Sequence, residues 1–239
     1  MVSKKVYYKD LNSIAYREAW DLQSELQAEL IARKRGNRNL PEVEQKKIHH
    51  YLLFCEHNPV YTLGKSGSKG HLLLSEDQLN NGSYEYFKIN RGGDITYHGP
   101  GQVTGYPIFD LDDFFTDVHR YVRTLEEVII LTLQEYGIVG KRIKEYTGVW
   151  IDVKEGEIER KICAIGVHLS RWVTLHGFAF NVNTRLEDFQ NIIPCGIDDE
   201  NKTVTSIEKE IGRKVDMEEV KTHLKRNFAA LFQYEYIDK

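Results

Sequence analysis

The helical pattern over residues 117–136 is the feature that most constrains the fold of this chain. Its apolar residues recur at the three- and four-residue spacing of a helix and form a broad apolar face: Val118, Tyr121, Val122, Leu125, Val128, Ile129, Leu131 and Leu133. A helix with such a wide apolar face must pack against another apolar layer. A second helical pattern, over residues 14–33, repeats Leu22, Leu26 and Leu30 every four residues, and Asn12 or Ser13 is expected to cap it.

Short apolar or alternating runs lie between and after these helical patterns and predict strands. The expected strands cover residues 5–8, 50–55, 84–90, 103–111, 149–153, 160–168 and 172–182. Two helices are expected to close the chain, over residues 206–211 and 217–233, with Asp216 capping the second. The strands come singly at first and then cluster, which favours an α+β fold with a mixed β-sheet flanked by helices. We expect one domain over residues 1–239.

Turn residues and caps mark the connections between these segments. The polar residues 33–47, which include Gly36, Asn37 and Pro41, predict a surface loop and are the best candidate for disorder. Ser75 and Gln78 form a capping-box pattern that predicts a short helix. Residues 154–157 are expected to turn a hairpin.

Composition excludes several classes of protein. The net charge of −4 does not favour a general affinity for nucleic acid, so no nucleic-acid partner is expected. No apolar run approaches the roughly 20 residues that span a bilayer, and no secretory signal is expected, so no membrane partner is predicted either. The odd, sparse set of Cys55, Cys163 and Cys195 argues against a disulfide framework and favours a reducing, cytoplasmic location.

Cys195 is the leading candidate for a reactive group. It lies between Pro194 and Gly196 on an irregular segment, whereas a core cysteine normally lies within a strand or helix. The pKa of a free cysteine thiol is about 8.5. The Coulomb attraction between a thiolate and an ammonium about 4 Å away is about 4 kcal/mol at an effective dielectric constant of about 20. A lysine beside Cys195 could therefore hold it as thiolate and exchange protons during acyl transfer. Pro-Cys-Gly alone also fits an ordinary turn.

Lys161 is the candidate for that lysine. It follows charged residues and begins the apolar run of residues 162–165, although a surface lysine at a strand end would give the same pattern. Cys163 shares the strand face of Lys161 by two-residue alternation, and we expect it to serve packing.

A glycine-dense segment is the second strong signal. Its glycines allow close approach of backbone to a ligand and expose amide groups that could polarise a carbonyl or hold an anion. The alternative is that the segment is a hairpin turn with no binding role. It matches neither a P-loop nor a dinucleotide-binding fingerprint. The segment reads Arg91, Gly92, Gly93, Asp94, Ile95, Thr96, Tyr97, His98, Gly99, Pro100, Gly101 and Gln102.

Three histidines next to turns or glycines, His57, His98 and His176, leave other chemistries to consider. No His-x₃-His or Cys-x-x-Cys spacing supports zinc, so no metal is expected. A cysteine hydrolase with His98 or His176 as its base stays open, because spacing alone does not exclude it.

Four blocks of the chain together resemble the octanoyltransferases of lipoate biosynthesis. They are residues 56–64, residues 91–102, Lys161-Ile162 with residues 171–181, and residues 194–197, and the likeness extends from about residue 50 to residue 207. The resemblance implies the fold of the biotin/lipoate protein ligase catalytic domains, in which helices lie on the outer side of a mixed sheet.

The resemblance also implies a reaction and its participants. Cys195 would take the octanoyl group from octanoyl-acyl carrier protein as a thioester, and Lys161 would lower the thiol pKa and act as acid and base. The acceptor would be a lysine on the lipoyl domains of 2-oxoacid dehydrogenase complexes or on the H protein of glycine cleavage. The implied substrate-contacting residues are Arg91, Gly92, Gly93, Asp94, Ile95, Thr96, Tyr97, His98, Ala164, Ile165, Gly166, Gly177, Phe178 and Ala179.

Transfer from a thioester to an amide runs downhill, so no ATP or other cofactor is expected. The alternative is an ATP-dependent lipoate or biotin protein ligase, which activates a free carboxylate and needs a nucleotide site in place of a nucleophilic cysteine. A binding module that only docks lipoyl domains would have lost the nucleophile, whereas Cys195 and Lys161 are both present.

Overall fold

A mixed sheet of nine strands forms the centre of the fold. The computed structural model describes residues 4–81, 83–154, 156–193 and 201–237. The strand order is β12-β1-β2-β6-β10-β9-β8-β7, with β11 beside β9. The β1–β2, β1–β12 and β9–β11 pairs are parallel and the others antiparallel. The strands are β1 Lys4–Ile14, β2 His50–His57, β6 Gln102–Ile108, β7 Gly140–Ile143, β8 Tyr146–Ile151, β9 Glu159–Ser170, β10 Val173–Asn181, β11 Lys202–Val204 and β12 Tyr234–Ile237.

A second, three-stranded sheet packs beside the first. Its order is β4 (Glu85–Lys88), β3 (Val60–Leu63) and β5 (Ile95–His98), with β3 parallel to β4 and antiparallel to β5. Tyr61, Tyr97 and Phe189 are buried in the apolar cluster beneath it. The short elements α2 (Glu76–Asn80), η2 (Lys69–His71) and η4 (Leu186–Asn191) complete this part of the molecule.

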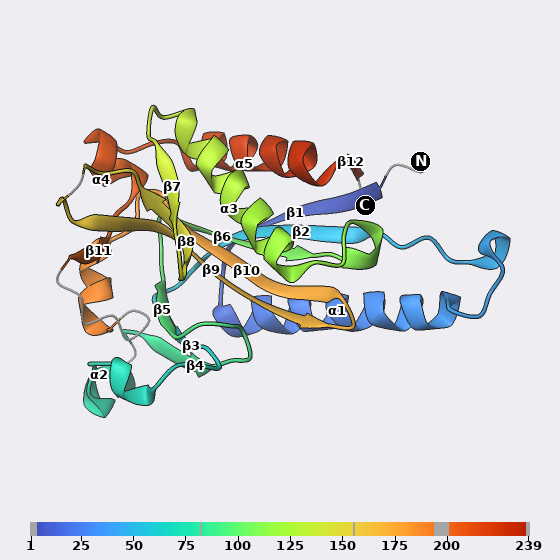
Figure 1. Cartoon of the computed structure of the whole chain (residues 1–239). Coiled ribbons are helices and arrows are strands. Elements are labelled where there is room, and N and C mark those ends of the chain that lie inside the picture. The colour runs from blue at the N-terminus through green and yellow to red at the C-terminus, as the bar shows by residue number, and fades with distance from the viewer. Residues whose placement is uncertain (1–3, 82, 155, 194–200, 238–239) are drawn as a thin grey trace.

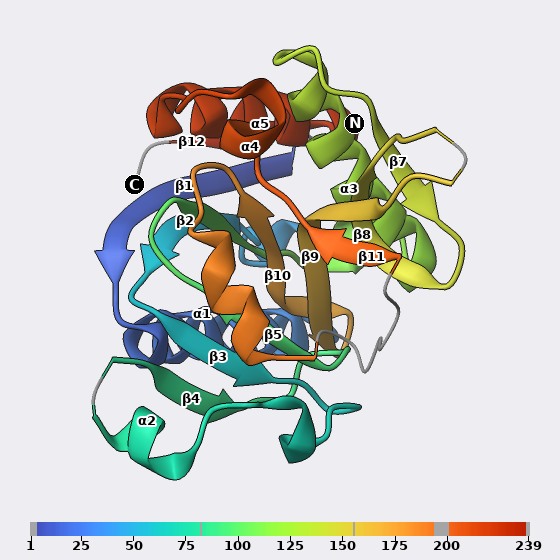
Figure 2. The same cartoon turned by 90° about the vertical axis from the view of Figure 1, so that its left-hand side faces the viewer.

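Helices cover both faces of the large sheet (Figures 1 and 2). The helices α3 (Val118–Gln134) and α5 (Met217–Phe232) pack on one face, and α1 (Tyr16–Asn37) and the small sheet lie on the other. Short segments η1 (Glu42–Glu44), η3 (Leu111–Asp113) and α4 (Ile207–Ile211) connect the layers. None of the helices in the described residues has the length and apolarity needed to span a bilayer.

The strand β2 shows why this arrangement suits the sequence. Its side chains alternate between two cores: Leu52 and Phe54 face α3 and α5, whereas Leu53 and Cys55 face α1. A strand covered on both faces carries a continuous apolar run rather than an alternating one. The run at residues 51–55 therefore requires helices on both sides of the sheet.

Most of the expected elements are confirmed. The pattern over residues 117–136 forms α3, Asp117 accepts a hydrogen bond from the Arg120 amide, and Ser75 and Gln78 form the predicted capping box. The closing helices α4 and α5 form, and the Asp216 side chain caps α5 as expected. Ser206, which was expected as the first residue of its helix, is the residue whose side chain caps α4.

Three expectations at the chain ends and in the first loop are wrong. Asn12 and Ser13 do not cap α1, because they lie in β1 and the helix begins after Ala15 without a side-chain cap. The loop expected from residue 33 is helical up to Asn37, whose side chain then hydrogen-bonds the Lys46 backbone. The chain does not end on a helix, because β12 follows α5 and pairs with β1.

The aromatic cluster under α5 generates a stability prediction. Phe228 is fully buried and stacks between Phe178 and Phe232, with ring centroids 5.9 and 5.7 Å away. Truncating a buried phenylalanine costs about 3–5 kcal/mol. Phe228→Ala should therefore lower the urea unfolding free energy by roughly that amount, whereas Thr222→Ala on the exposed face of the same helix should change it by less than about 0.5 kcal/mol.

Candidate active site

A cavity of about 290 Å³ lies between the large sheet and the glycine-dense segment. The segment crosses above β9, where the Gly92 amide donates to the Val167 carbonyl at 2.9 Å. This crossing needs a glycine beneath it, because a Cβ on Gly166 would lie 2.9 Å from both Gly92 O and the Arg91 side chain. Gly93 turns the segment with φ of +81°, a conformation that other L-residues rarely adopt.

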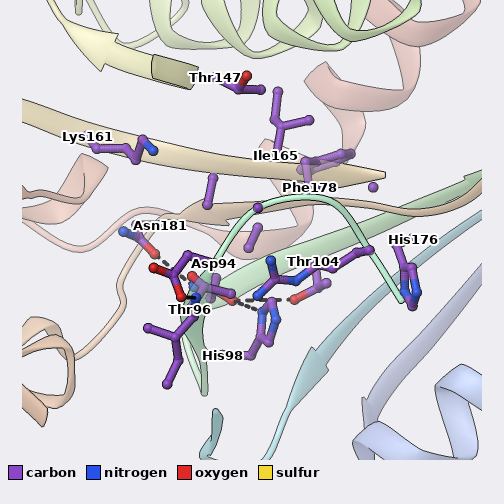
Figure 3. Close-up of a pocket in the computed structure, with 18 of the residues that line it drawn as sticks. Asp94, Thr96, His98, Thr104, Thr147, Lys161, Ile165, His176, Phe178 and Asn181 are labelled. Carbon is purple, nitrogen blue, oxygen red and sulfur yellow. Dashed lines mark hydrogen bonds between the residues drawn. The ribbon is translucent and has the colours of Figure 1, made fainter. Parts of the chain in front are cut away.

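The structure brings nearly all of the predicted site residues in the described ranges to this cavity (Figure 3). Gly92 and Tyr97 are the exceptions: Gly92 is engaged with β9, and Tyr97 packs in the small-sheet core. Cys195 lies outside the described residues. Those that line the cavity are Lys161, Arg91, Gly93, Asp94, Ile95, Thr96, His98, Ala164, Ile165, Gly166, Gly177, Phe178 and Ala179.

Other lining residues were not among the substrate-contacting residues that the sequence implied. Gln102, His176 and Asn181 belong to the blocks at residues 91–102 and 171–181, whereas the others come from elements far apart in the chain and share no local pattern. They are Tyr16, Gln102, Thr104, Tyr106, Glu145, Tyr146, Thr147, His176, Asn181, Phe189 and Val204.

Arg91 anchors the glycine-dense segment to the small sheet. Its guanidinium donates to the Thr62 carbonyl at 2.6 Å, to the Thr62 hydroxyl at 3.0 Å and to the Gly92 carbonyl at 3.0 Å. Asp94 holds the next turn, since its carboxylate accepts from the Ile95 amide at 2.7 Å and contacts His71 Nδ1 at 2.5 Å. Hydrogen bonds within the chain itself thus fix the segment.

A buried chain of hydrogen bonds joins this segment to Lys161. His98 Nδ1 lies 2.9 Å from Gln102 Oε1, and the Gln102 amide donates to Asn181 Oδ1 at 2.9 Å. Asn181 in turn donates to the Thr205 carbonyl at 2.9 Å, and the Thr205 amide donates to the Lys161 carbonyl at 2.9 Å. Because the carboxamide oxygen of Gln102 only accepts, His98 Nδ1 carries the proton. A fully satisfied buried network of this kind holds its members rigidly.

Lys161 lies where β9 meets β11 and the end of η4. It pairs with Val204 of β11, and its ammonium lies over the Trp150 ring, 4.9 Å from the centroid. Phe189 of η4 and Val204 line the cavity together with Lys161. These two residues precede and follow the segment 194–200, so both flanks of the segment that carries Cys195 reach the Lys161 end of the cavity.

The histidines around the cavity are neutral because burial removes the charged form from water. Burial lowers the pKa of His57 to about 4 and that of His176 to about 3, and it holds the pKa of His98 well below its usual range. His176 Nε2 lies 2.8 Å from Asn90 Oδ1, at the opposite end of the labelled residues from Lys161 (Figure 3).

The two cysteines in the described residues are placed for packing rather than reaction. Cys55 and Cys163 are fully buried, and burial raises the pKa of both thiols. The Lys161 charge acts in the opposite direction on Cys163 but does not overcome burial. The packing role expected for Cys163 is therefore confirmed. Within the described ranges no cluster of three or more histidine, cysteine or acidic side chains could hold a metal ion.

Comparisons by sequence find close relatives of this chain. Residues 15–229 match the family model of the lipoyl protein ligase A/B catalytic domain. The chain is 55% identical to an octanoyltransferase of Cytophaga hutchinsonii over 97% of its own length and 94% of the relative. It is 52% identical to an octanoyltransferase of Christiangramia forsetii, with 98% of both chains covered.

Comparisons by structure find the same fold in distant proteins. A bipartite lipoate protein ligase of Thermoplasma acidophilum matches with a TM-score of 0.70 at 17% identity, covering 100% of this chain and 87% of the other. A lipoate-protein ligase A bound with ATP matches with a TM-score of 0.65 at 18% identity, covering 100% and 90%. These matches confirm the expected fold of a mixed sheet flanked by helices.

The depressed pKa of His57 predicts loss of stability in acid. Below about pH 6.5 the unfolded chain binds a proton at this residue, whereas the folded chain does not until about pH 4, so the unfolding free energy falls as pH decreases through this window. His57→Gln should make that decline shallower by up to about 1.4 kcal/mol per pH unit.

Urea unfolding at a series of pH values measures this slope, and it separates the proton effect from the loss of the His57 hydrogen bonds, which lowers stability at every pH. His119→Gln, on an exposed position of α3, is the matched control. Parallel pH profiles for His57→Gln and the parent protein would contradict the prediction.

Proposed function

The chain belongs to the octanoyltransferases of the lipoyl protein ligase A/B catalytic domain family, and on this premise we propose that it moves an octanoyl group between two carriers through Cys195. The donor is octanoyl-acyl carrier protein, and the acceptor is a lysine of a lipoyl domain in a 2-oxoacid dehydrogenase complex or of the glycine cleavage H protein. The protein is thus an acyltransferase that needs no ATP, because a thioester is already an activated acyl group.

The first step forms an acyl-enzyme. The Cys195 thiolate attacks the thioester carbonyl, a new carbon–sulfur bond forms, and the bond to the carrier sulfur breaks. The carrier leaves as a thiol with a proton from the Lys161 ammonium. In the second step the ε-amine of the acceptor lysine attacks the enzyme thioester, an amide forms, and Cys195 is released as thiolate while Lys161 takes up the proton that the amine loses.

The placement of Lys161 is the observation that carries this proposal. Its backbone carbonyl accepts from Thr205, its strand neighbour is Val204, and it shares the cavity with Phe189, so it lies between the two flanks of the segment that holds Cys195. An ammonium that approaches the thiol to about 4 Å supplies about 4 kcal/mol at an effective dielectric constant of about 20, enough to favour the thiolate near neutral pH.

The cavity supports an acyl chain as the transferred group. Its wall along β9 and β10 combines small residues, Ala164, Gly166 and Ala179, with the apolar side chains of Ile165 and Phe178. Small residues leave room for a narrow chain, and apolar surface favours its burial at about 25 cal/mol per Å². A phosphate-binding loop for a nucleotide is not needed for this reaction, because no ATP takes part in it.

The requirement for a reduced thiol fits a cytoplasmic location.

Replacement of the nucleophile tests the proposal directly. Incubation with octanoyl-acyl carrier protein should add one octanoyl mass to the parent protein, and addition of an apo lipoyl domain should remove it from the enzyme and place it on the domain. Cys195→Ala should show no mass increment, whereas Cys163→Ala, which changes a buried packing thiol, should retain it.

Mass analysis also separates the alternatives. In a parallel incubation with ATP and free octanoate, formation of octanoyl-adenylate would indicate a ligase. An acyl-enzyme that reacts faster with water than with the lipoyl domain would indicate a hydrolase. An unmodified parent protein would contradict the acyl-enzyme proposal.

Removal of the Lys161 charge should raise the thiol pKa of Cys195, because a nearby cation stabilises the thiolate. The rate of Cys195 alkylation rises with pH as the thiol ionises. In Lys161→Ala we expect the midpoint of this rise to lie at least about one pH unit higher than in the parent protein. Peptide mass mapping after iodoacetamide treatment at a series of pH values isolates Cys195 from the other cysteines. Lys88→Ala, on an exposed position of β4, should leave the profile in place, and an unshifted Lys161→Ala profile would rule out the proposed role.

A further inference from the structure

A second cavity of about 340 Å³ adjoins the first at Lys161. Lys161, Phe189 and Val204 line both cavities, so the two meet where the proposed reaction takes place. The first cavity extends from Lys161 toward the glycine-dense segment and His176, and the second continues along β11 and η4, with Gln190, Lys202 and Thr203 in its wall.

The second cavity is positively charged although the chain is not. Lys161, Lys202 and Lys209 line it, and Glu187 is the one acidic residue among the described lining residues. The net charge of the whole chain is −4, so this group of lysines departs from the average of the surface. The neighbouring Glu210 carboxylate is paired with Arg160 at 2.9 Å. A cavity wall with this balance of charges favours an anionic ligand.

Two aromatic rings fix the lysines at the junction of the cavities. The Lys161 ammonium lies 4.9 Å from the Trp150 ring centroid, and the Lys202 ammonium lies 4.9 Å from that of Tyr146. The two rings contact each other edge to face at 6.1 Å. Cation–π contacts of this kind hold an ammonium group in place.

We propose that the second cavity binds the phosphate-bearing arm of the donor thioester, with Lys202 and Lys209 as the contacts to its phosphate. This inference rests on the proposed function. An acyl carrier protein holds its acyl group on a phosphopantetheine arm, in which polar amides separate the thioester from a phosphate. With the thioester at Lys161, the acyl chain enters the first cavity and the arm leaves through the second, so the phosphate reaches the lysines of β11 and α4.

The test compares donors with and without the phosphate. Octanoyl-pantetheine and octanoyl-4′-phosphopantetheine have the same acyl chain and the same amides and differ only in the phosphate. Octanoyl-acyl carrier protein and octanoyl-coenzyme A carry the same phosphorylated arm, attached to a protein in the first and to a nucleotide in the second. The rate of acyl-enzyme formation is measured for each donor at subsaturating concentration. The variants are Lys202→Ala/Lys209→Ala, its charge-retaining counterpart Lys202→Arg/Lys209→Arg, and the control Lys88→Ala/Lys214→Ala at exposed positions.

We expect the alanine double variant to lose ten-fold or more in rate with the three phosphorylated donors and to stay within two-fold of the parent protein with octanoyl-pantetheine. The arginine variant should retain most of the rate, and the control should be unaffected. The preserved rate with octanoyl-pantetheine also shows that the variant is folded and that its reaction centre is intact.

Three results would overturn the inference. An equal loss with octanoyl-pantetheine would mean that the lysines act on the reaction centre and not on a phosphate. A loss confined to the carrier protein would mean that they contact the carrier's surface. An unchanged rate with all donors would mean that the arm lies elsewhere. A parent protein that forms no acyl-enzyme with any donor would instead contradict the proposed function itself.

Discussion

The buried hydrogen-bond chain from His98 through Gln102 and Asn181 to Thr205 is the interaction on which the site depends. It crosses from the glycine-dense segment to β11, and the Thr205 amide closes it on the Lys161 carbonyl. Each polar group in this chain is buried, so a missing partner would cost its full desolvation free energy of about 1–3 kcal/mol. The positions of the segment above the cavity and of the lysine at its end are therefore coupled.

The same burial determines the chemistry that the cavity can support. Burial depresses the pKa of His57, His98 and His176, so none of them carries a charge near neutral pH. A neutral histidine acts as a base through its unprotonated ring nitrogen, and in His98 and His57 that atom, Nε2, lies 3.3 Å from the Thr62 hydroxyl and 2.7 Å from the Tyr106 hydroxyl. Lys161 differs from them because it lies at the meeting point of the two cavities with its ammonium over Trp150. These observations are consistent with the proposed role of Lys161 as the partner of the Cys195 thiol.

The two cavities that meet at Lys161 suggest how one site serves a long donor. Apolar and small residues of β9 and β10 form the wall on one side, and lysines of β11 and α4 lie on the other. The distant structural relatives are lipoate ligases with the same fold at below 20% identity. The shared fold alone does not specify the chemistry, which depends on the side chains placed at this junction.

The sequence by itself determined the features that rest on neighbouring residues. The spacing of apolar residues in α3, the capping by Ser75 and Asp216, and the glycine-dense segment are all local patterns, and each was predicted. The octanoyltransferase resemblance likewise followed from four short blocks. Pairing between distant segments was decided only in the tertiary structure. Lys4 pairs in parallel with Tyr234, and β11 pairs with β9. Gln102, Asn181 and Val204 meet around one cavity. Strand pairing and side-chain packing of this kind depend on long-range contacts, which leave no periodic pattern in the chain.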